Sequence, residues 1–275
     1  MAAVSMAAVK ELRERLGAGM VDSKNALTEA DGDIEKAIEI LRLKGLKGVA
    51  KREGREASEG LVAVKQGDDT TVMIELVCET DFVAKNEKFG ALGERVLEAI
   101  TAAGAKTLEE ALAAPAEGKT VGEVITDEAA IIGERIELRR VAVTEGTTAV
   151  YLHRTSKDLP PQIGVVVGYT GDDAKAALSI AQHISFADPV YVTRDEVPEA
   201  EVEKERELVT EISKNEGKPE AALPKIVEGR LNAFFKQVVL NEQIHALDEE
   251  KRTVAKVAEA AGITVTGFAR CKVGS

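Results

Sequence analysis

Few residues in this sequence are placed to make or break covalent bonds. The histidines His153, His183 and His245 are far apart, and neither Cys78 nor Cys271 falls in a metal-binding spacing. The chain contains no Gly-x-Ser-x-Gly and no His-Glu-x-x-His pattern, which would indicate a serine nucleophile or a zinc site. Spacing alone singles out no pair of acidic residues. The sequence therefore predicts no catalytic centre, no bound metal and no cofactor.

Two glycine-containing stretches resemble phosphate-binding loops only in part. The Gly-Lys-Thr at 118–120 resembles the end of a nucleotide-binding loop, but Ala113 stands where the first glycine is required, and the preceding segment has a helical pattern. The glycines at 17 and 19 fail the dinucleotide pattern because Asp22 stands at the third glycine position. We therefore expect neither stretch to bind a nucleotide.

A different kind of chemistry, contact with another molecule, is suggested by residues 79–86, Glu-Thr-Asp-Phe-Val-Ala-Lys-Asn. They follow residues 71–78, an apolar run typical of a buried strand, and they precede residues 88–100, whose apolar residues recur at helical spacing. Thr80 or Asp81 is the expected N-cap, since a short oxygen-bearing side chain there accepts from free backbone N–H groups. The segment is therefore predicted to be a strand-to-helix corner.

Phe82 follows the predicted cap directly and allows two interpretations. Most aromatic side chains are buried, so Phe82 could pack beneath its own corner. Alternatively, Phe82 is an apolar wedge beside the carboxylate of Asp81, presented for insertion into a partner. The residues alone favour the first interpretation.

Composition limits the class of protein. The chain has 275 residues, 44% of them hydrophobic, and a net charge of −12. About two domains and a sizeable core are expected at this length. The negative charge disfavours broad binding to nucleic acid, because phosphates would be repelled. No apolar run approaches the roughly 20 residues that span a bilayer, and the N-terminus does not resemble a signal peptide. A cytoplasmic protein without direct membrane or nucleic-acid contact is expected.

Residues 1–45 are predicted to form a small three-helix unit. Apolar residues recur at helical steps from Val4, the glycines at 17 and 19 end the first helix, and further helices are expected over 20–30 and from Ile34. Such a bundle buries little area, which favours a docking module over an enzyme. Met20, beside the glycine turn, suits either a contact surface or the core of the bundle. Residues 46–59 follow as a basic linker.

The rest of the chain is predicted to be two related α/β halves with an insertion, which makes the whole an α+β protein. The first half covers residues 60–145, and the second covers 146–190 and 244–275. The order strand, strand, helix, closing strand occurs in both. Residues 191–243 are expected to form an antiparallel helical hairpin, with Pro224 in the first turn of the return helix. In that helix, Phe234 and Phe235 could face a partner or pack in the core.

Four motifs, in order along nearly the whole chain, resemble those of the bacterial elongation factor Ts family. They are residues 12–20 with Asp22, Lys24, Ala26 and Leu27; residues 80–86; residues 227–231 with Phe235; and residues 265–268.

The resemblance implies a guanine-nucleotide exchange factor, not an enzyme, that binds elongation factor Tu one-to-one during polypeptide elongation. It implies that residues 1–45 are a ubiquitin-associated-like domain that docks on the GTPase through Leu12, Arg13, Met20 and Val21. It implies that residues 80–83, namely Thr80, Asp81, Phe82 and Val83, act near the magnesium and phosphate site, with Asp81 and Phe82 inserting there. His153 would contact another domain of the partner.

Two departures and two alternatives accompany the resemblance. Many relatives carry a further C-terminal helical module, whereas this sequence ends at Ser275, soon after the closing strand. The hairpin serves self-association in some relatives, which leaves the oligomeric state open. The first alternative is an adaptor that uses only its N-terminal unit. The second is an RNA-associated factor acting through the basic linker, although such a run is more often a solvated connection. The cations of this linker are Lys47, Lys51, Arg52 and Arg55, and Lys44 lies just before it.

Overall fold

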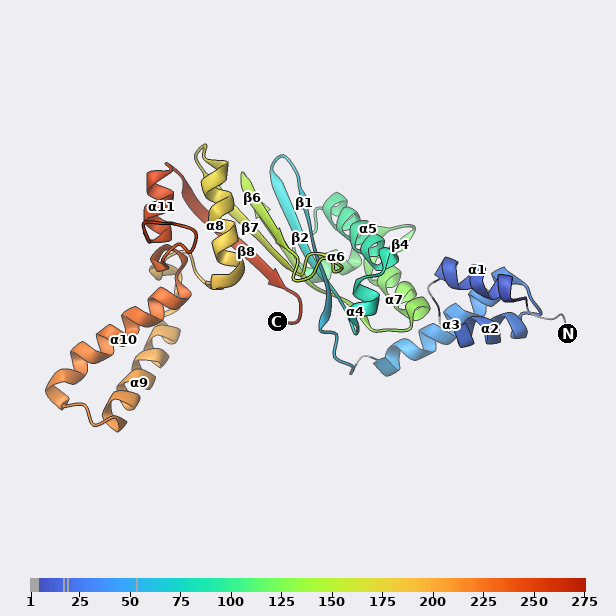
Figure 1. Ribbon diagram of the computed structural model, residues 1–275, viewed down its shortest axis with the longest axis horizontal. Helices are drawn as coiled ribbons and strands as arrows, with labels where there is room; N and C mark the ends of the chain where they lie inside the picture. Colours follow the sequence, from blue (N-terminus) through green and yellow to red (C-terminus); the bar gives the residue numbers. More distant parts are fainter. Residues whose placement is uncertain (1–4, 17, 19, 53) are drawn as a thin grey trace.

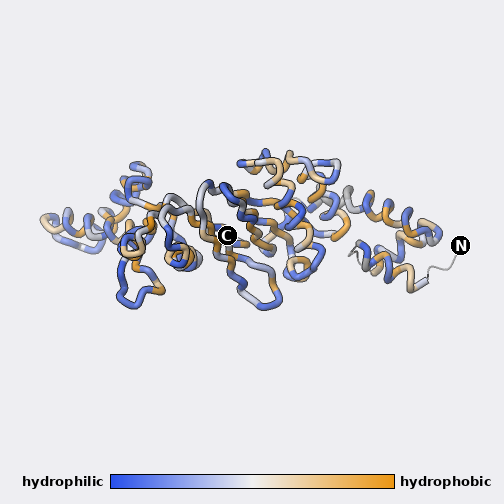
Figure 2. The backbone as a smooth tube through the Cα atoms, turned by 90° about the horizontal axis from the view of Figure 1, so that it is seen from above, coloured by the Kyte–Doolittle hydropathy of each residue, from blue (hydrophilic) through white to orange (hydrophobic). Residues whose placement is uncertain are grey.

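The computed structural model describes residues 5–16, 18, 20–52 and 54–275. The molecule is elongated, with the N-terminal helices at one end, a helical hairpin at the other and two sheets between them (Figures 1 and 2). Helices and strands both contribute to the core, so the protein belongs to the α+β class, as the sequence predicts. None of the helices in the described ranges is long and apolar enough to cross a membrane.

The N-terminal unit contains α1 (Met6–Leu16), α2 (Met20–Glu29) and α3 (Ile34–Arg52). Its core is built from small and aliphatic side chains, including Leu12 and Leu27. One predicted boundary is wrong: α3 continues to Arg52, so the first part of the predicted 46–59 linker is helical. As a whole, α3 packs against the first α/β half. The glycines at 17 and 19 lie outside the described residues.

The first half is a three-stranded antiparallel sheet covered on one face by helices. Its strands are ordered β1 (Glu59–Gln66), β2 (Thr70–Cys78), β5 (Ile136–Glu145). The covering helices are α5 (Glu87–Ala103), α6 (Leu108–Ala113) and α7 (Val121–Ile132). Capping boxes at Thr107 and Thr120 begin α6 and α7, as their sequence spacing predicts. The rejected Gly-Lys-Thr lies at the start of the short hairpin strand β4 (Lys119–Thr120), which pairs with β3 (Pro115–Ala116).

The second half has the same order of strand, strand, helix and closing strand. Its antiparallel sheet has the order β6 (Thr148–His153), β7 (Ile163–Thr170), β8 (Thr264–Lys272), and α8 (Ala174–Ala187) covers its outer face. A short helix, α11 (Val254–Ala260), precedes β8 and was not expected from the sequence.

The two sheets pack face to face. Val62 and Met73 of the first sheet meet Val166 and Cys271 of the second in one buried cluster. Helices cover the two outer faces, so the core has four layers in the order helix, sheet, sheet, helix (Figure 1).

The insertion between α8 and α11 is an antiparallel helical hairpin. It consists of α9 (Glu199–Asn215) and α10 (Leu223–Val238), with 3-10 turns η1 (Arg194–Glu196), η2 (Glu220–Ala222) and η3 (Leu240–Glu242) around them. Val209, Val227 and Leu231 form the small core between its helices. At its base, the backbone N–H groups of Val190 and Tyr191 both donate to the carbonyl of Val238. Backbone hydrogen bonds therefore attach the hairpin to the second half.

Candidate protein-docking site

The corner after β2 contains two consecutive helices instead of one. A single turn, α4 (Asp81–Ala84), comes first, and α5 begins at Glu87. Thr80 is the N-cap of α4: its backbone is extended, and its Oγ1 accepts a hydrogen bond from the N–H of Val83 at 3.4 Å. Asn86 caps α5 by accepting from the N–H of Lys88 at 2.9 Å. The chain therefore turns sharply twice, and both turns are fixed by caps.

Phe82 points away from the protein, and its residue is 83% exposed. Ala84 is buried and Val83 packs against the core of the first half. Successive helical residues are rotated by about 100°, so inward-facing Ala84 leaves Phe82 on the opposite side of the single turn. Phe89, near the start of α5, is by contrast fully buried and belongs to the same core cluster as Ala84. The interpretation of Phe82 as a core residue is therefore wrong, and the wedge interpretation remains.

Two carboxylates fasten the corner to the turn between α7 and β5. Glu134 accepts hydrogen bonds from the N–H of Thr80 at 3.0 Å and from its hydroxyl at 2.6 Å. In the opposite direction, Glu79 accepts from the N–H of Arg135 at 2.7 Å and pairs with Arg55 at 3.1 Å. Hydrogen bonds to charged acceptors are among the stronger ones in proteins. No pattern in the sequence indicated Glu134, because its partner Thr80 is distant along the chain.

Asp81 is already paired in the free protein. Its carboxylate accepts a hydrogen bond from the Lys85 ammonium at 2.6 Å, one helical turn along. This hydrogen bond holds the pKa of Asp81 below its ordinary value of 3.8. Both side chains are substantially exposed, so solvent screens the pair. The corner therefore presents an aromatic ring beside an exchangeable ion pair.

His153 lies at the end of β6 and is exposed. Its Nδ1 is 3.2 Å from the hydroxyl of Tyr151. The loop that follows, residues 154–162, crosses to the first half, where Leu159 packs against the core and the carbonyl of Pro161 accepts from the N–H of Val62 at 2.8 Å. The two halves are thus joined along the chain segment that begins at His153.

The N-terminal candidates divide into surface and core residues. Met20 and Val21 are 51% and 69% exposed, and Arg13 is also exposed. Leu12 is completely buried among the three helices. The prediction that Leu12 itself contacts the partner is therefore not supported by its position. The Leu12 side chain packs in the core and holds α1 in place, whereas Arg13, Met20 and Val21 lie on the surface.

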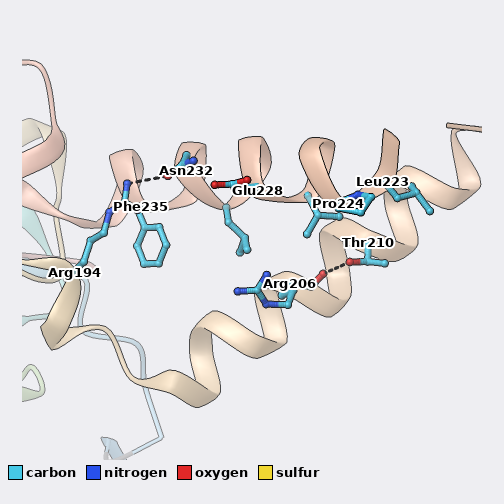
Figure 3. A pocket seen from close by; sticks show the side chains of 10 residues that line it. Arg194, Arg206, Thr210, Leu223, Pro224, Glu228, Asn232 and Phe235 are labelled. Carbon is cyan, nitrogen blue, oxygen red and sulfur yellow. Dashed lines mark hydrogen bonds between the residues drawn. The ribbon is translucent and has the colours of Figure 1, made fainter. Parts of the chain in front are cut away.

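The hairpin carries a groove between α9 and α10 (Figure 3). The guanidinium of Arg194 lies 4.3 Å from the ring centre of Phe235 and also donates to Oδ1 of Asn232 at 3.0 Å. Phe234 and Phe235 are both half-buried, and their rings lie 5.6 Å apart. Part of each ring is therefore used in packing at the base of the hairpin.

Two histidines that are distant in sequence are stacked in the second half. The rings of His183 and His245 lie 5.3 Å apart, and each Nδ1 accepts a hydrogen bond from a backbone N–H, of Ala246 and Leu247 respectively. Burial lowers the pKa of both histidines. A nitrogen that accepts an N–H bond has no lone pair left for a metal. Across the described ranges, no cluster of three or more His, Cys, Asp or Glu side chains could hold a metal ion.

Comparison with known proteins identifies relatives over the full length. A sequence family described as elongation factor TS matches residues 79–275, beginning at the first residue of the corner. Proteins named elongation factor Ts from Clavibacter michiganensis and Leifsonia xyli are 67% and 66% identical, with complete coverage of both chains. The protein of that name from Micrococcus luteus is 56% identical, again over the whole of both chains.

Proposed function

The chain belongs to the elongation factor Ts family, and on that premise we propose that it is a guanine-nucleotide exchange factor for the translational GTPase elongation factor Tu. It acts in the cytoplasm during polypeptide elongation, by binding and without covalent chemistry of its own. The observation that carries this proposal is Phe82, an almost fully exposed aromatic side chain on a helix turn that is fixed from both sides.

The exposed ring supplies binding energy. Burying a phenylalanine side chain contributes about 1.5–3 kcal/mol, and almost all of this is still available in free Phe82. The corner is already held by Glu134 and by the Thr80 cap, so little conformational entropy is lost when it binds. An exposed aromatic anchor on a rigid support is the usual form of a hot spot in a protein interface.

The second half provides an internal comparison for the corner. There the equivalent link, from β7 to α8, consists only of residues 171–173, and Asp173 caps the helix directly. In the first half, the link from β2 to α5 covers residues 79–86 and includes α4. A strand-to-helix connection on this sheet therefore needs only a short turn. The additional residues are those that present Phe82, which supports a role in function beyond connecting two elements.

The proposed mechanism follows from how a GTPase holds GDP. Its phosphate loop binds through backbone N–H groups, and a magnesium ion bridges the phosphates. Phe82, inserted beside that site, displaces the elements that position the ion and the β-phosphate. On binding, the Asp81 carboxylate leaves its ion pair with Lys85 and accepts hydrogen bonds from polar groups of the partner. The carboxylate therefore enters the interface without losing its hydrogen-bond partners. The binding of the factor and the binding of nucleotide to the GTPase are thermodynamically coupled. If the factor lowers the affinity of the GTPase for GDP, then incoming nucleotide lowers its affinity for the factor and releases it.

Contacts elsewhere complete the proposed one-to-one complex. Arg13, Met20 and Val21 form the N-terminal docking surface on the same GTPase domain, and His153 contacts a second domain. Thr80 and Val83 support the wedge from within the corner. The RNA alternative is not favoured, since Arg55 of the linker is paired with Glu79.

Release of fluorescent GDP from purified elongation factor Tu, followed by stopped flow, tests the proposal. The wild-type chain is expected to accelerate release in a concentration-dependent and saturable way, and excess GDP is expected to dissociate the complex. A chain that leaves the release rate unchanged at saturating concentration would contradict the proposed function. Capture of RNA without the GTPase from a cell lysate would support the alternative.

A further inference from the structure

Helix α3 approaches α7 more closely than side chains allow. A Cβ atom placed on Gly45 would lie 2.1 Å from the carbonyl oxygen of Ala130 and 2.5 Å from its carbonyl carbon. Both atoms belong to the backbone of α7, so no side-chain rotation could relieve the overlap. Glycine is less favourable than alanine in the interior of a helix. Its use here is explained by the close crossing of the two helices.

Charged groups hold the crossing on either side of Gly45. Arg42 of α3 donates through Nε to Asp127 of α7 at 3.3 Å and through Nη2 to its second oxygen, and Lys119 also pairs with Asp127. Further along α3, the guanidinium of Arg52 lies 3.5 Å from the carbonyl oxygen of Ala129. The N-terminal unit is therefore fixed to the first half through α3 and not joined to it by a loose tether.

The same α7 also supports the corner. At its C-terminal end the chain turns at Gly133, whose φ of 88° is easily adopted only by glycine. Glu134 follows directly and accepts both hydrogen bonds from Thr80. One helix of 12 residues thus carries α3 against its side and holds the corner at its end.

We infer that α7 is a strut that sets the spacing between the N-terminal docking surface (Arg13, Met20, Val21) and Phe82, and that Gly45 is the positioning residue that seats α3 on this strut. The inference rests on the proposed function and adds to it a geometric requirement. Two contact points held at the spacing that the GTPase requires bind together, because the second contact forms at high effective concentration. The same two points on a loose connection lose most of this advantage.

The test is Gly45→Ala, with Gly229→Ala as the matched control. In α10, a Cβ on Gly229 would meet nothing within 4 Å. Gly45→Ala is expected to raise by tenfold or more the factor concentration that gives half-maximal GDP release. The maximal rate should change by less than about twofold, because the corner is intact. Gly229→Ala should change neither quantity. Arg42→Gln, which removes only the ion pair, should act in the same direction as Gly45→Ala but less strongly.

A second measurement reports the strut without the GTPase. Spin labels on cysteines introduced at the exposed positions Lys24 and Asp172 give a distance distribution between the N-terminal unit and the second half. The native cysteines, Cys78 and Cys271, are buried and do not compete for label. The distribution is expected to be narrow in the otherwise wild-type chain and in Gly229→Ala, and broader or shifted in Gly45→Ala. Circular dichroism checks that helix content is retained.

The outcomes separate the inference from the proposed function. If Gly45→Ala gives the wild-type distance distribution, or broadens it without raising the half-maximal concentration, the strut inference is wrong. If Gly45→Ala raises the stability of the protein and changes neither the distance distribution nor the half-maximal concentration, the close crossing of α3 and α7 has no positioning role. If the wild-type chain itself does not accelerate GDP release, the proposed function fails, while the distance measurement still reports whether α7 seats α3.

Discussion

Replacing Phe82 by alanine tests the wedge most directly. The side chain is 83% exposed, so its removal should alter the free energy of unfolding by less than about 0.5 kcal/mol. In the complex, the loss of a buried aromatic anchor should remove about 2–3 kcal/mol. At about 1.4 kcal/mol for each factor of ten, GDP release at saturating factor should slow by roughly 30- to 150-fold if that energy is used at the transition state for release.

The assay is single-turnover release of fluorescent GDP over a series of factor concentrations, together with urea denaturation of the free variant. Phe186→Ala is the matched control, because Phe186 is also an exposed phenylalanine, at 59%, and lies on the second half. It should leave the release rate within about twofold of wild type. Phe89→Ala provides the opposite contrast: Phe89 is fully buried, and its loss should destabilise the fold by about 3–5 kcal/mol.

A folded Phe82→Ala variant with the wild-type maximal rate would refute the wedge. If only the half-maximal concentration changed, Phe82 would be an anchor that binds equally before and during release. The reasoning requires that the maximal rate falls, because the ring is proposed to act on the elements that hold nucleotide.

The remaining predictions concern groups that hold the corner and the halves together. Glu134→Ala should lower the free energy of unfolding by about 1–2 kcal/mol in urea denaturation and slow GDP release. Unchanged values of both would contradict the role of Glu134 in holding Thr80 and the corner in place. Burial between the sheets raises the pKa of Glu75 against the opposing effect of Arg140, so its contribution to stability is present at acid pH and is lost as pH rises through the raised pKa. Glu75→Gln should therefore raise the melting temperature more at about pH 7 than at about pH 4, and an equal effect at both would contradict this. Burial lowers the pKa of His183 and His245, so the stability linked to them is present above their unfolded value of about 6.5 and is lost as pH falls through the lowered values. Hydrogen-exchange protection at the base of the hairpin, measured relative to the intrinsic exchange rate at each pH, should be lower at about pH 5 than at about pH 7, and pH-independent protection there would contradict the linkage.

Local patterns predicted the regular elements well. The capping boxes at Thr107 and Thr120 and the apolar strand at 71–78 depend on neighbouring residues, and the structure confirms each of them. The repeated order of strands and helix followed from the same patterns. The family motifs indicated residues 80–83, but composition and spacing alone did not distinguish an exposed Phe82 from a buried one.

Features set by distant contacts were not predictable in the same way. The predicted N-terminal unit ended at residue 45, yet α3 continues to Arg52, and the missing side chain of Gly45 lets the helix pack closely on α7. Thr80 and Glu134 are 54 residues apart, and no periodicity joins them. Leu12 lies within a family motif, but only the packed bundle shows that it is a core residue. Local propensity predicts the secondary structure of each segment, whereas the roles of these residues depend on contacts between segments that are far apart in the sequence.

The energetics explain why the wedge needs the rest of the molecule. The roughly 2–3 kcal/mol available from Phe82 changes a dissociation rate by about two orders of magnitude at most. The contact proposed for Met20 acts differently from Phe82, because it is made equally before and during release and therefore sets the factor concentration that is needed and not the maximal rate. It contributes fully only when α3 holds it at the required distance from Phe82. A chain with Phe82 intact and α3 unseated should therefore keep nearly the wild-type maximal rate but reach it only at a higher factor concentration, which is why Gly45 and Phe82 are expected to affect different parameters of the same assay.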